Sequence, residues 1–207
     1  LPSGQAVVVN ADGTVSVVAA VAQAVGSEAV FESARADQIS STFDSNSNKV
    51  VIAYKDVGNS NYGTCVVGTV SGTSISFGTP VVFESANCTA TSATFDSNSN
   101  KVVIAYTDGG NSSYGTAIVG TVSGTSISFG TPAVFESAGI SYPKATFESN
   151  SNKVVIAYRD NGNSSFGTAI VGTVSSTSIS FGAAAVFESS NSVYISSTFD
   201  SLNNKVV

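Results

Sequence analysis

Short apolar or alternating runs, separated by polar turns, follow one another along most of this chain. The runs "KVVIAY" and "AIVGTV" are apolar or small at every position, whereas "TSISF" alternates polar with apolar residues. Runs of this length that are rich in Val, Ile, Thr, Phe and Tyr predict β-strands. Apolar character on both faces indicates sheets that are covered on both sides. The expected fold class is therefore all-β, built from antiparallel sheets.

The same pattern recurs at a fixed interval. "FDSNSNKVVIAY" begins at Phe43 and Phe95, "FESNSNKVVIAY" at Phe147 and a shortened "FDSLNNKVV" at Phe199, so the interval is 52 residues. A fixed period of this size is typical of repeat architectures. We expect one domain made of full units at 34–85, 86–137 and 138–189, with half-units at 1–33 and 190–207.

Each unit reads as four strands. In the second unit we expect strands at 91–95, 101–107, 115–122 and 126–136, the last of them broken near 130–132. The length and strand number suit a blade of a β-propeller with four-stranded antiparallel blades. A two-sheet sandwich and a β-solenoid are the competing architectures, but solenoid coils are usually shorter and a sandwich needs no periodicity.

The two ends of the chain each carry part of a unit. "AVVVNADGTVSVV" reads as a hairpin around Asp12-Gly13, where the last two strands of a blade would lie. The C-terminal end holds the beginnings of the first two strands. The two parts together predict a four-bladed ring with one composite blade, and the alternative is a section of a longer array.

Composition limits the kinds of partner. The chain has 8 Lys and Arg against 14 Asp and Glu, a net charge of −6, which argues against nucleic acid and anionic membranes. The apolar stretch at 15–25 is too short to span a bilayer, so no membrane insertion is expected. With no His and only two Cys, a zinc site is excluded, and no cofactor is expected.

Differences between the copies concentrate in four windows, at 34–41, 86–93, 138–145 and 190–197. Each window follows "FES" or its equivalent and leads into the first strand of a unit. Binding groups usually lie on such connections, at the mouth of the central channel in a propeller. Drift of unconstrained loops would give the same variation. The candidate ligand-binding residues are Arg35, Asp37, Gln38, Tyr142, Lys144 and Tyr194.

Repeated carboxylates are the only candidates for catalysis or metal binding. They form three series: Asp44, Asp96, Glu148 and Asp200; Asp56, Asp108 and Asp160; Glu32, Glu84, Glu136 and Glu188. Catalysis needs two carboxyl groups in different environments rather than the same residue in every unit. Turn capping explains the first series better. The "DxGNS" loop falls short of an EF-hand, and it resembles the Asp-box of sialidase-type propellers only faintly. We expect no catalytic residue and no metal.

Two further groups of residues leave alternatives open. Cys65 and Cys88 do not recur in the other units, and they are either a disulfide or two isolated small apolar residues. Asn87, Asn111 and Asn163 fit the N-glycosylation pattern, which chance also produces in a chain rich in Asn and Ser.

"NADGTVSVV", followed by units that contain "VGTVSGTSISFGTP", resembles tandem-repeat, propeller-like proteins encoded by phages and bacteria and in marine and other aquatic metagenomes. The resemblance covers nearly the whole chain and supplies no binding residues. It implies a virion-appendage or surface role, such as a tail fibre or adhesin. We therefore expect a non-enzymatic structural and recognition module, located outside the cell, on its surface or on a virion. The expected partners are copies of itself or other surface or virion proteins, and the alternative is a glycan-binding propeller lectin.

Overall fold

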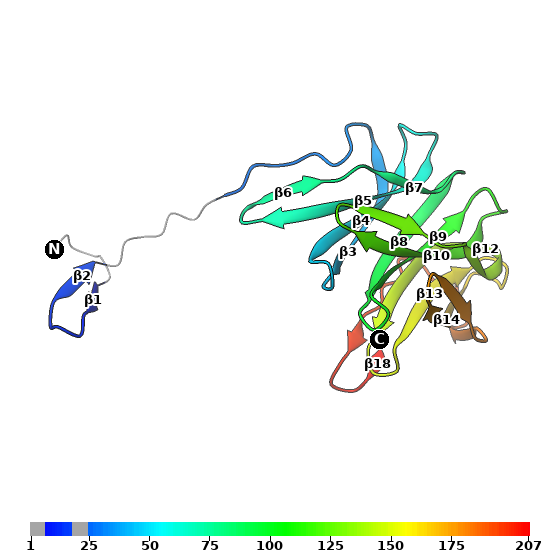
Figure 1. Cartoon of the computed structure of the whole chain (residues 1–207). Helices are drawn as coiled ribbons and strands as arrows, with labels where there is room; N and C mark the ends of the chain where they lie inside the picture. Colours follow the sequence, from blue (N-terminus) through cyan, green and yellow to red (C-terminus); the bar gives the residue numbers. More distant parts are fainter. Residues whose placement is uncertain (1–6, 18–24) are drawn as a thin grey trace.

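The computed structural model describes residues 7–17 and 25–207, and every regular element in them is a β-strand (Figure 1). All strand pairs are antiparallel, so the predicted fold class is confirmed. Parts of the expected N-terminal half-unit, residues 1–6 and 18–24, lie outside the described residues. Within 7–17 and 25–207 the structure contains no helix that could cross a membrane.

The first sheet shows how one unit is built. Its strands are β3 (Ala36–Asp44), β4 (Lys49–Asp56), β5 (Tyr62–Ser71), β6 (Ser74–Phe77) and β7 (Val81–Glu84). The order is β3-β4-β5, and both β6 and β7 pair with the outer side of β5. The fourth strand of the unit is thus broken into two pieces. The break predicted in the second unit is confirmed, because one strand there ends at Phe129 and the next begins at Ala133.

The second and third sheets follow the same plan and share one long strand. The second contains β8 (Cys88–Asp96), β9 (Lys101–Asp108), β10 (Tyr114–Ser123) and β11 (Ser126–Phe129); the third contains β13 (Lys153–Asp160), β14 (Phe166–Ser175), β15 (Ser178–Phe181) and β16 (Ala185–Glu188). Strand β12 (Ala133–Glu148) pairs with β10 along its first half and with β13 along its second. Separate strands were predicted here. The connection stays extended because Gly139 pairs with Tyr114 and Ile140 with Asp160.

Two small hairpins contain the remaining strands. β1 (Val7–Val9) and β2 (Val15–Val17) form one hairpin, and the predicted turn at Asp12-Gly13 lies between them. β17 (Phe199–Asp200) and β18 (Lys205–Val206) form the other. Each hairpin is a two-stranded sheet of its own, so the expected composite unit is not formed in this structure (Figure 1).

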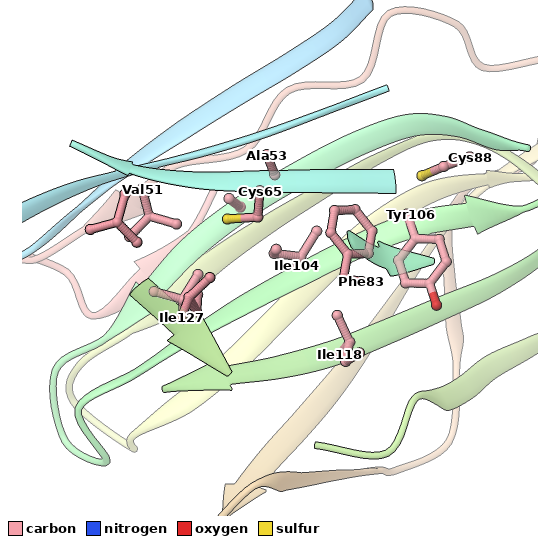
Figure 2. Close-up of a cluster of buried hydrophobic side chains, with 12 residues drawn as sticks. Val51, Ala53, Cys65, Phe83, Cys88, Ile104, Tyr106, Ile118 and Ile127 are labelled. Carbon is pink, nitrogen blue, oxygen red and sulfur yellow. The ribbon is translucent and has the colours of Figure 1, made fainter. Parts of the chain in front are cut away.

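The sheets pack face to face with large side chains against small ones. In β9, Val102, Ile104 and Tyr106 face the first sheet and lie in one cluster with Val51 and Ala53 of β4 (Figure 2). We call the face that carries Val, Ile and Tyr the leading face, and the opposite face, which carries Val and Ala, the trailing face. One strand can carry both faces because successive side chains of a β-strand point to opposite sides of the sheet.

The second interface repeats the first. Val103 and Ala105 of β9 pack with Val154, Ile156 and Tyr158 of β13. Full burial of one such side chain contributes about 1.5–3 kcal/mol, so these two clusters hold most of the apolar stabilisation. In the second sheet, the doubly apolar strands β9 and β10 predicted from the sequence therefore have both of their faces covered.

A Phe–Tyr–Glu contact joins each unit to the next one. The rings of Phe83 and Tyr106 lie 5.3 Å apart, and the Tyr106 hydroxyl donates a hydrogen bond of 3.2 Å to Glu84. The same contacts recur one unit earlier and one unit later, between Phe31, Glu32 and Tyr54 and between Phe135, Glu136 and Tyr158. The end of one unit is therefore fastened to the central strand of the following unit.

Glycine is required where the outer edge of one unit meets a turn of the next. A Cβ added to Gly130 would lie 1.9 Å from the carbonyl oxygen of Thr177, whereas at Gly182 the nearest atom would be 3.8 Å away. We predict that Gly130→Ala lowers the free energy of unfolding by about 1–3 kcal/mol, because a backbone atom cannot rotate away. The matched change Gly182→Ala should have a far smaller effect. Urea unfolding of both variants measures this, and equal losses would contradict the packing.

The carboxyl group of Glu84 should make stability depend on pH. Burial, reinforced by the charge of Asp108, raises the pKa of Glu84 above its ordinary value. The folded state then favours the protonated form, so stability decreases as pH rises from about 4.5 through the folded pKa. Glu148, whose pKa is lowered by the Ser151 hydroxyl, acts in the opposite direction at lower pH.

We predict that Glu84→Gln flattens the pH dependence above pH 4.5, because an amide still accepts the Tyr106 hydrogen bond but carries no charge. Denaturant unfolding at several pH values between about 4 and 7 measures the slope. A slope identical to that of the unmodified protein would contradict the assignment.

Candidate functional site

A residue with left-handed backbone conformation occupies the fifth position of each of the four variable windows. Gln38, Ala90, Tyr142 and Tyr194 have φ values of 53°, 55°, 54° and 54°. In the first three units this residue lies in a β-bulge, where the pairing with the second strand shifts register. We call these four residues the bulge row. Non-glycine residues in this conformation store strain, which is frequent at functional sites.

Pro143 belongs to the same irregularity. The pairing of β12 with β13 is interrupted between Ser141 and Lys144, so Pro143 is not required to donate a ladder hydrogen bond. Proline in a strand is tolerated at such bulges. The bulge therefore explains how the variable window can include Pro143 inside a 16-residue strand.

Hydrogen bonds between successive first strands fix the bulge row in place. The backbone N–H of Ala93 donates to Ser40 Oγ at 2.9 Å, and that of Ala145 donates to Ser92 Oγ at 3.0 Å. The hydroxyl of Thr91 donates to the carbonyl oxygen of Gln38. Neighbouring units are thus joined at the strands that carry the variable residues.

A small cavity opens among the bulges of the three complete units, with a volume of about 220 Å³. We call it the rim pocket. It is lined by Gln38, Thr89, Ala90, Thr107, Ile140, Ser141 and Tyr142. The structure therefore brings two of the predicted candidates, Gln38 and Tyr142, into one site.

Thr107 is a site residue that sequence reasoning missed. It is only 3% exposed, and its hydroxyl has no hydrogen-bond partner within the part of the chain that the structure describes. It pairs with Thr89 in the ladder, next to the bulge. A signal was present, because the residue after "KVVIAY" changes between the units, from Lys55 to Thr107 and Arg159.

The two candidate tyrosines lie together. The ring centroids of Tyr142 and Tyr194 are 5.6 Å apart with an interplanar angle of 42°, and Tyr194 is 84% exposed. An exposed aromatic pair can contact a ligand with its ring faces and its hydroxyl groups. The aromatic part of the predicted site is therefore contiguous from one unit to the next.

Tyr194 and the three charged candidates do not line the rim pocket. Arg35 forms an ion pair of 2.9 Å with Asp37, and the Arg35 side chain is largely exposed. Lys144 lies two residues beyond Tyr142 in β12, where it pairs with Ala157. The predicted charged groups thus stand apart from the pocket.

The carboxylates of the first two series cap turns, as predicted for the first. Asp96 accepts hydrogen bonds from the backbone N–H groups of Asn98 and Ser99, at 2.9 and 3.0 Å. Asp108 accepts from Gly110 and Asn111, at 3.0 and 3.1 Å. Among residues 7–17 and 25–207, no three acidic or Cys side chains are grouped to hold a metal ion.

The cysteines are two free thiols, so the disulfide alternative is wrong. Cys65 and Cys88 both belong to the apolar cluster between the first two sheets (Figure 2). Burial raises the pKa of the Cys65 thiol to about 12, and it also raises that of Cys88. Reactivity requires the thiolate, so both groups act as small apolar side chains.

The three asparagines of the glycosylation pattern are exposed. Asn87 precedes β8, and Asn111 and Asn163 lie in equivalent turns before β10 and β14. Their use as glycosylation sites stays a prediction.

A second, larger cavity lies on the trailing face of the third sheet, with a volume of about 690 Å³. Its lining includes Val155, Ala157, Ala169 and Phe187. We call this the open face. Phe187 is 56% exposed, whereas its equivalents Phe83 and Phe135 are 7% exposed.

Comparisons with protein-family models, curated proteins and solved structures found no match to this chain.

The strain of the bulge row can be tested at Ala90. Glycine adopts this conformation freely, whereas an L-residue loses about 1 kcal/mol in it. We predict that Ala90→Gly leaves stability unchanged or raises it by up to about 1 kcal/mol. The control Ala93→Gly, in the regular part of β8, should lower stability by about 1 kcal/mol. Thermal unfolding measures both, and a loss at Ala90 as large as that at Ala93 would contradict the bulge.

Proposed function

We propose that this chain is a non-enzymatic structural and recognition module of an extracellular fibre, spike or virion appendage. The proposal depends on one observation, the open face of the third sheet. Val171 on this face is 45% exposed, whereas its equivalents Val67 and Val119 are 1% and 0% exposed inside the molecule. A protein that presents a copy of its own internal interface is suited to joining further units of the same kind.

We further propose that the sheets are four-stranded blades arranged about a common axis with a 52-residue unit. This is supported by the first strands, which lie side by side and are joined through Ser40 and Ser92. The innermost strands of a radial arrangement approach most closely, and small hydroxyl side chains allow that approach. The alternating large and small faces would then continue around the axis.

The proposed occupant of the open face is the β1–β2 hairpin of a second copy. The hairpin exposes Val7, Val8 and Val9, and an isolated two-stranded hairpin is at most marginally stable in water. The open face offers an apolar surface, and β18 beside it pairs only with β17 among the strands that the structure describes. Among residues 7–17 and 25–207 nothing covers either surface, and joining two copies would cover both.

In the second copy, the segment that follows the hairpin already packs on the first sheet. Phe31, which follows the hairpin in the chain, packs on Tyr54 at a ring distance of 5.2 Å, as Phe83 does on Tyr106. Residues 25–33 therefore take the place of the last strand of a preceding unit. The C-terminal hairpin of one copy and the N-terminal segment of the next would then form one composite sheet.

The non-enzymatic part of the proposal rests on the carboxylates. Those of the first two series accept backbone hydrogen bonds in turns, and three members of the third accept a tyrosine hydroxyl. Groups that are occupied in the same way in successive units do not form the asymmetric acid–base pair that hydrolysis needs. The low charge, the surface rich in hydroxyl and amide groups and the resemblance to appendage proteins support a location outside the cell.

Assembly can be tested with two valines of equal exposure. Val171 and Val134 are each 45% exposed, but the equivalents of Val134, which are Val82 and Val186, are exposed in their units too. We predict that the unmodified protein forms head-to-tail assemblies and that Val171→Asp weakens their association by about 10-fold or more, because burying an unpaired charge is costly. Val134→Asp should assemble normally. Light scattering across a concentration series measures the mass.

Two results would contradict the proposed assembly. One is an unmodified protein that stays monomeric at every concentration. The other is a monomer whose β1–β2 amides are protected from hydrogen exchange, since the hairpin would then be docked within its own chain. Removal of residues 1–24 should give monomers if the second copy supplies the hairpin.

A further inference from the structure

We propose that the rim pocket binds a single sugar ring, that is, a small uncharged ligand with several hydroxyl groups. The inference rests on the recognition part of the proposed function and gives that recognition a ligand class. It does not depend on assembly, because the rim pocket and the open face share no lining residue.

The pocket exists because the bulge row is interrupted by a small residue. The row reads Gln38, Ala90, Tyr142 and Tyr194, and only Ala90 has a side chain too short to reach a neighbour. One unit further along, the corresponding tyrosines pack against each other at 5.6 Å. The methyl group of Ala90 therefore leaves a space that a larger side chain in the same row would fill.

The size and charge of the lining limit the ligand. The volume of about 220 Å³ is below the roughly 300–1,000 Å³ of pockets for drug-sized molecules, so one ring fits better than an extended chain. None of the seven lining residues is charged. An anion or a cation would find no partner of opposite charge, whereas a neutral polar molecule loses nothing by this absence.

Thr107 supplies a hydrogen-bonding group that the described part of the chain does not use. Its hydroxyl is buried and has no partner among residues 7–17 and 25–207, although a hydroxyl can both donate and accept. A buried polar group without a partner destabilises the structure, and a ligand hydroxyl would remove that penalty. The same position holds the charged residues Lys55 and Arg159 in the other units, so only the second unit places a neutral hydroxyl there.

Tyr142 and Gln38 complete the site with two different surfaces. An aromatic ring offers a flat face to the C–H groups of a pyranose ring, and its hydroxyl remains available at the edge. The amide of Gln38 provides both donors and acceptors for ligand hydroxyl groups. Together with Thr107 and Ser141, the pocket presents polar groups around an apolar wall, which is the pattern of small-molecule sites.

The test uses four free monosaccharides, namely glucose, galactose, mannose and N-acetylglucosamine, with saturation-transfer NMR and calorimetry on the full chain. At least one should bind the unmodified protein. Ala90→Tyr should abolish binding, because the tyrosine ring would fill the pocket. Tyrosine fits this backbone conformation, since it occupies the equivalent positions 142 and 194. Thr107→Val should weaken binding by about 2- to 10-fold, the range of one hydrogen bond.

The matched control is Thr116→Val. Thr116 is another buried threonine whose hydroxyl has no partner in the described ranges of the chain, but it does not line the pocket, so binding should be unchanged. Absence of binding by all four monosaccharides would overturn the proposal, as would an Ala90→Tyr protein that binds as well as the unmodified one. Light scattering of the same samples reports assembly separately, so loss of sugar binding with intact assembly refutes the ligand class alone.

Discussion

The packing of a large face against a small one is the interaction on which the rest of this structure depends. Val102, Ile104 and Tyr106 enter the surface formed by Val51 and Ala53, and the third sheet repeats that contact on the second. Such sheets have no single central core, since each is stabilised by its neighbours. A sheet without a neighbour on one side consequently exposes apolar side chains, as the third sheet does at Phe187 and Val171.

Much of the fold was predictable because local chemistry and packing agree in this sequence. The broken fourth strand was visible from the glycine and proline near residue 130, and the capping role of Asp96 from the short polar turn after it. The continuous strand β12 was not visible, because pairing of Gly139 and Ile140 with two different sheets is a tertiary effect. Whether Cys65 and Cys88 form a disulfide could not be predicted for the same reason, since spacing alone does not place one relative to the other.

The candidate site was predictable in location but only partly in membership. Variation between units identified Gln38, Tyr142 and Tyr194, which share the strained conformation of the bulge row. It also selected Arg35 and Lys144, which lie away from the pocket, because variation does not distinguish exposed positions from lining ones. Thr107 was not predicted, because it is a single variable position at the end of an otherwise constant strand. Only its pairing with Thr89 beside the bulge shows that it belongs to the site.

The inequality of the two faces of each sheet has a directional consequence. Like faces do not fit each other, because two bulky surfaces would collide and two small ones would leave a void. Any filament built from these contacts must therefore be polar, with one tip chemically distinct from the other. Growth at the two tips would proceed at different rates, and a single capping protein could terminate one of them without affecting its opposite.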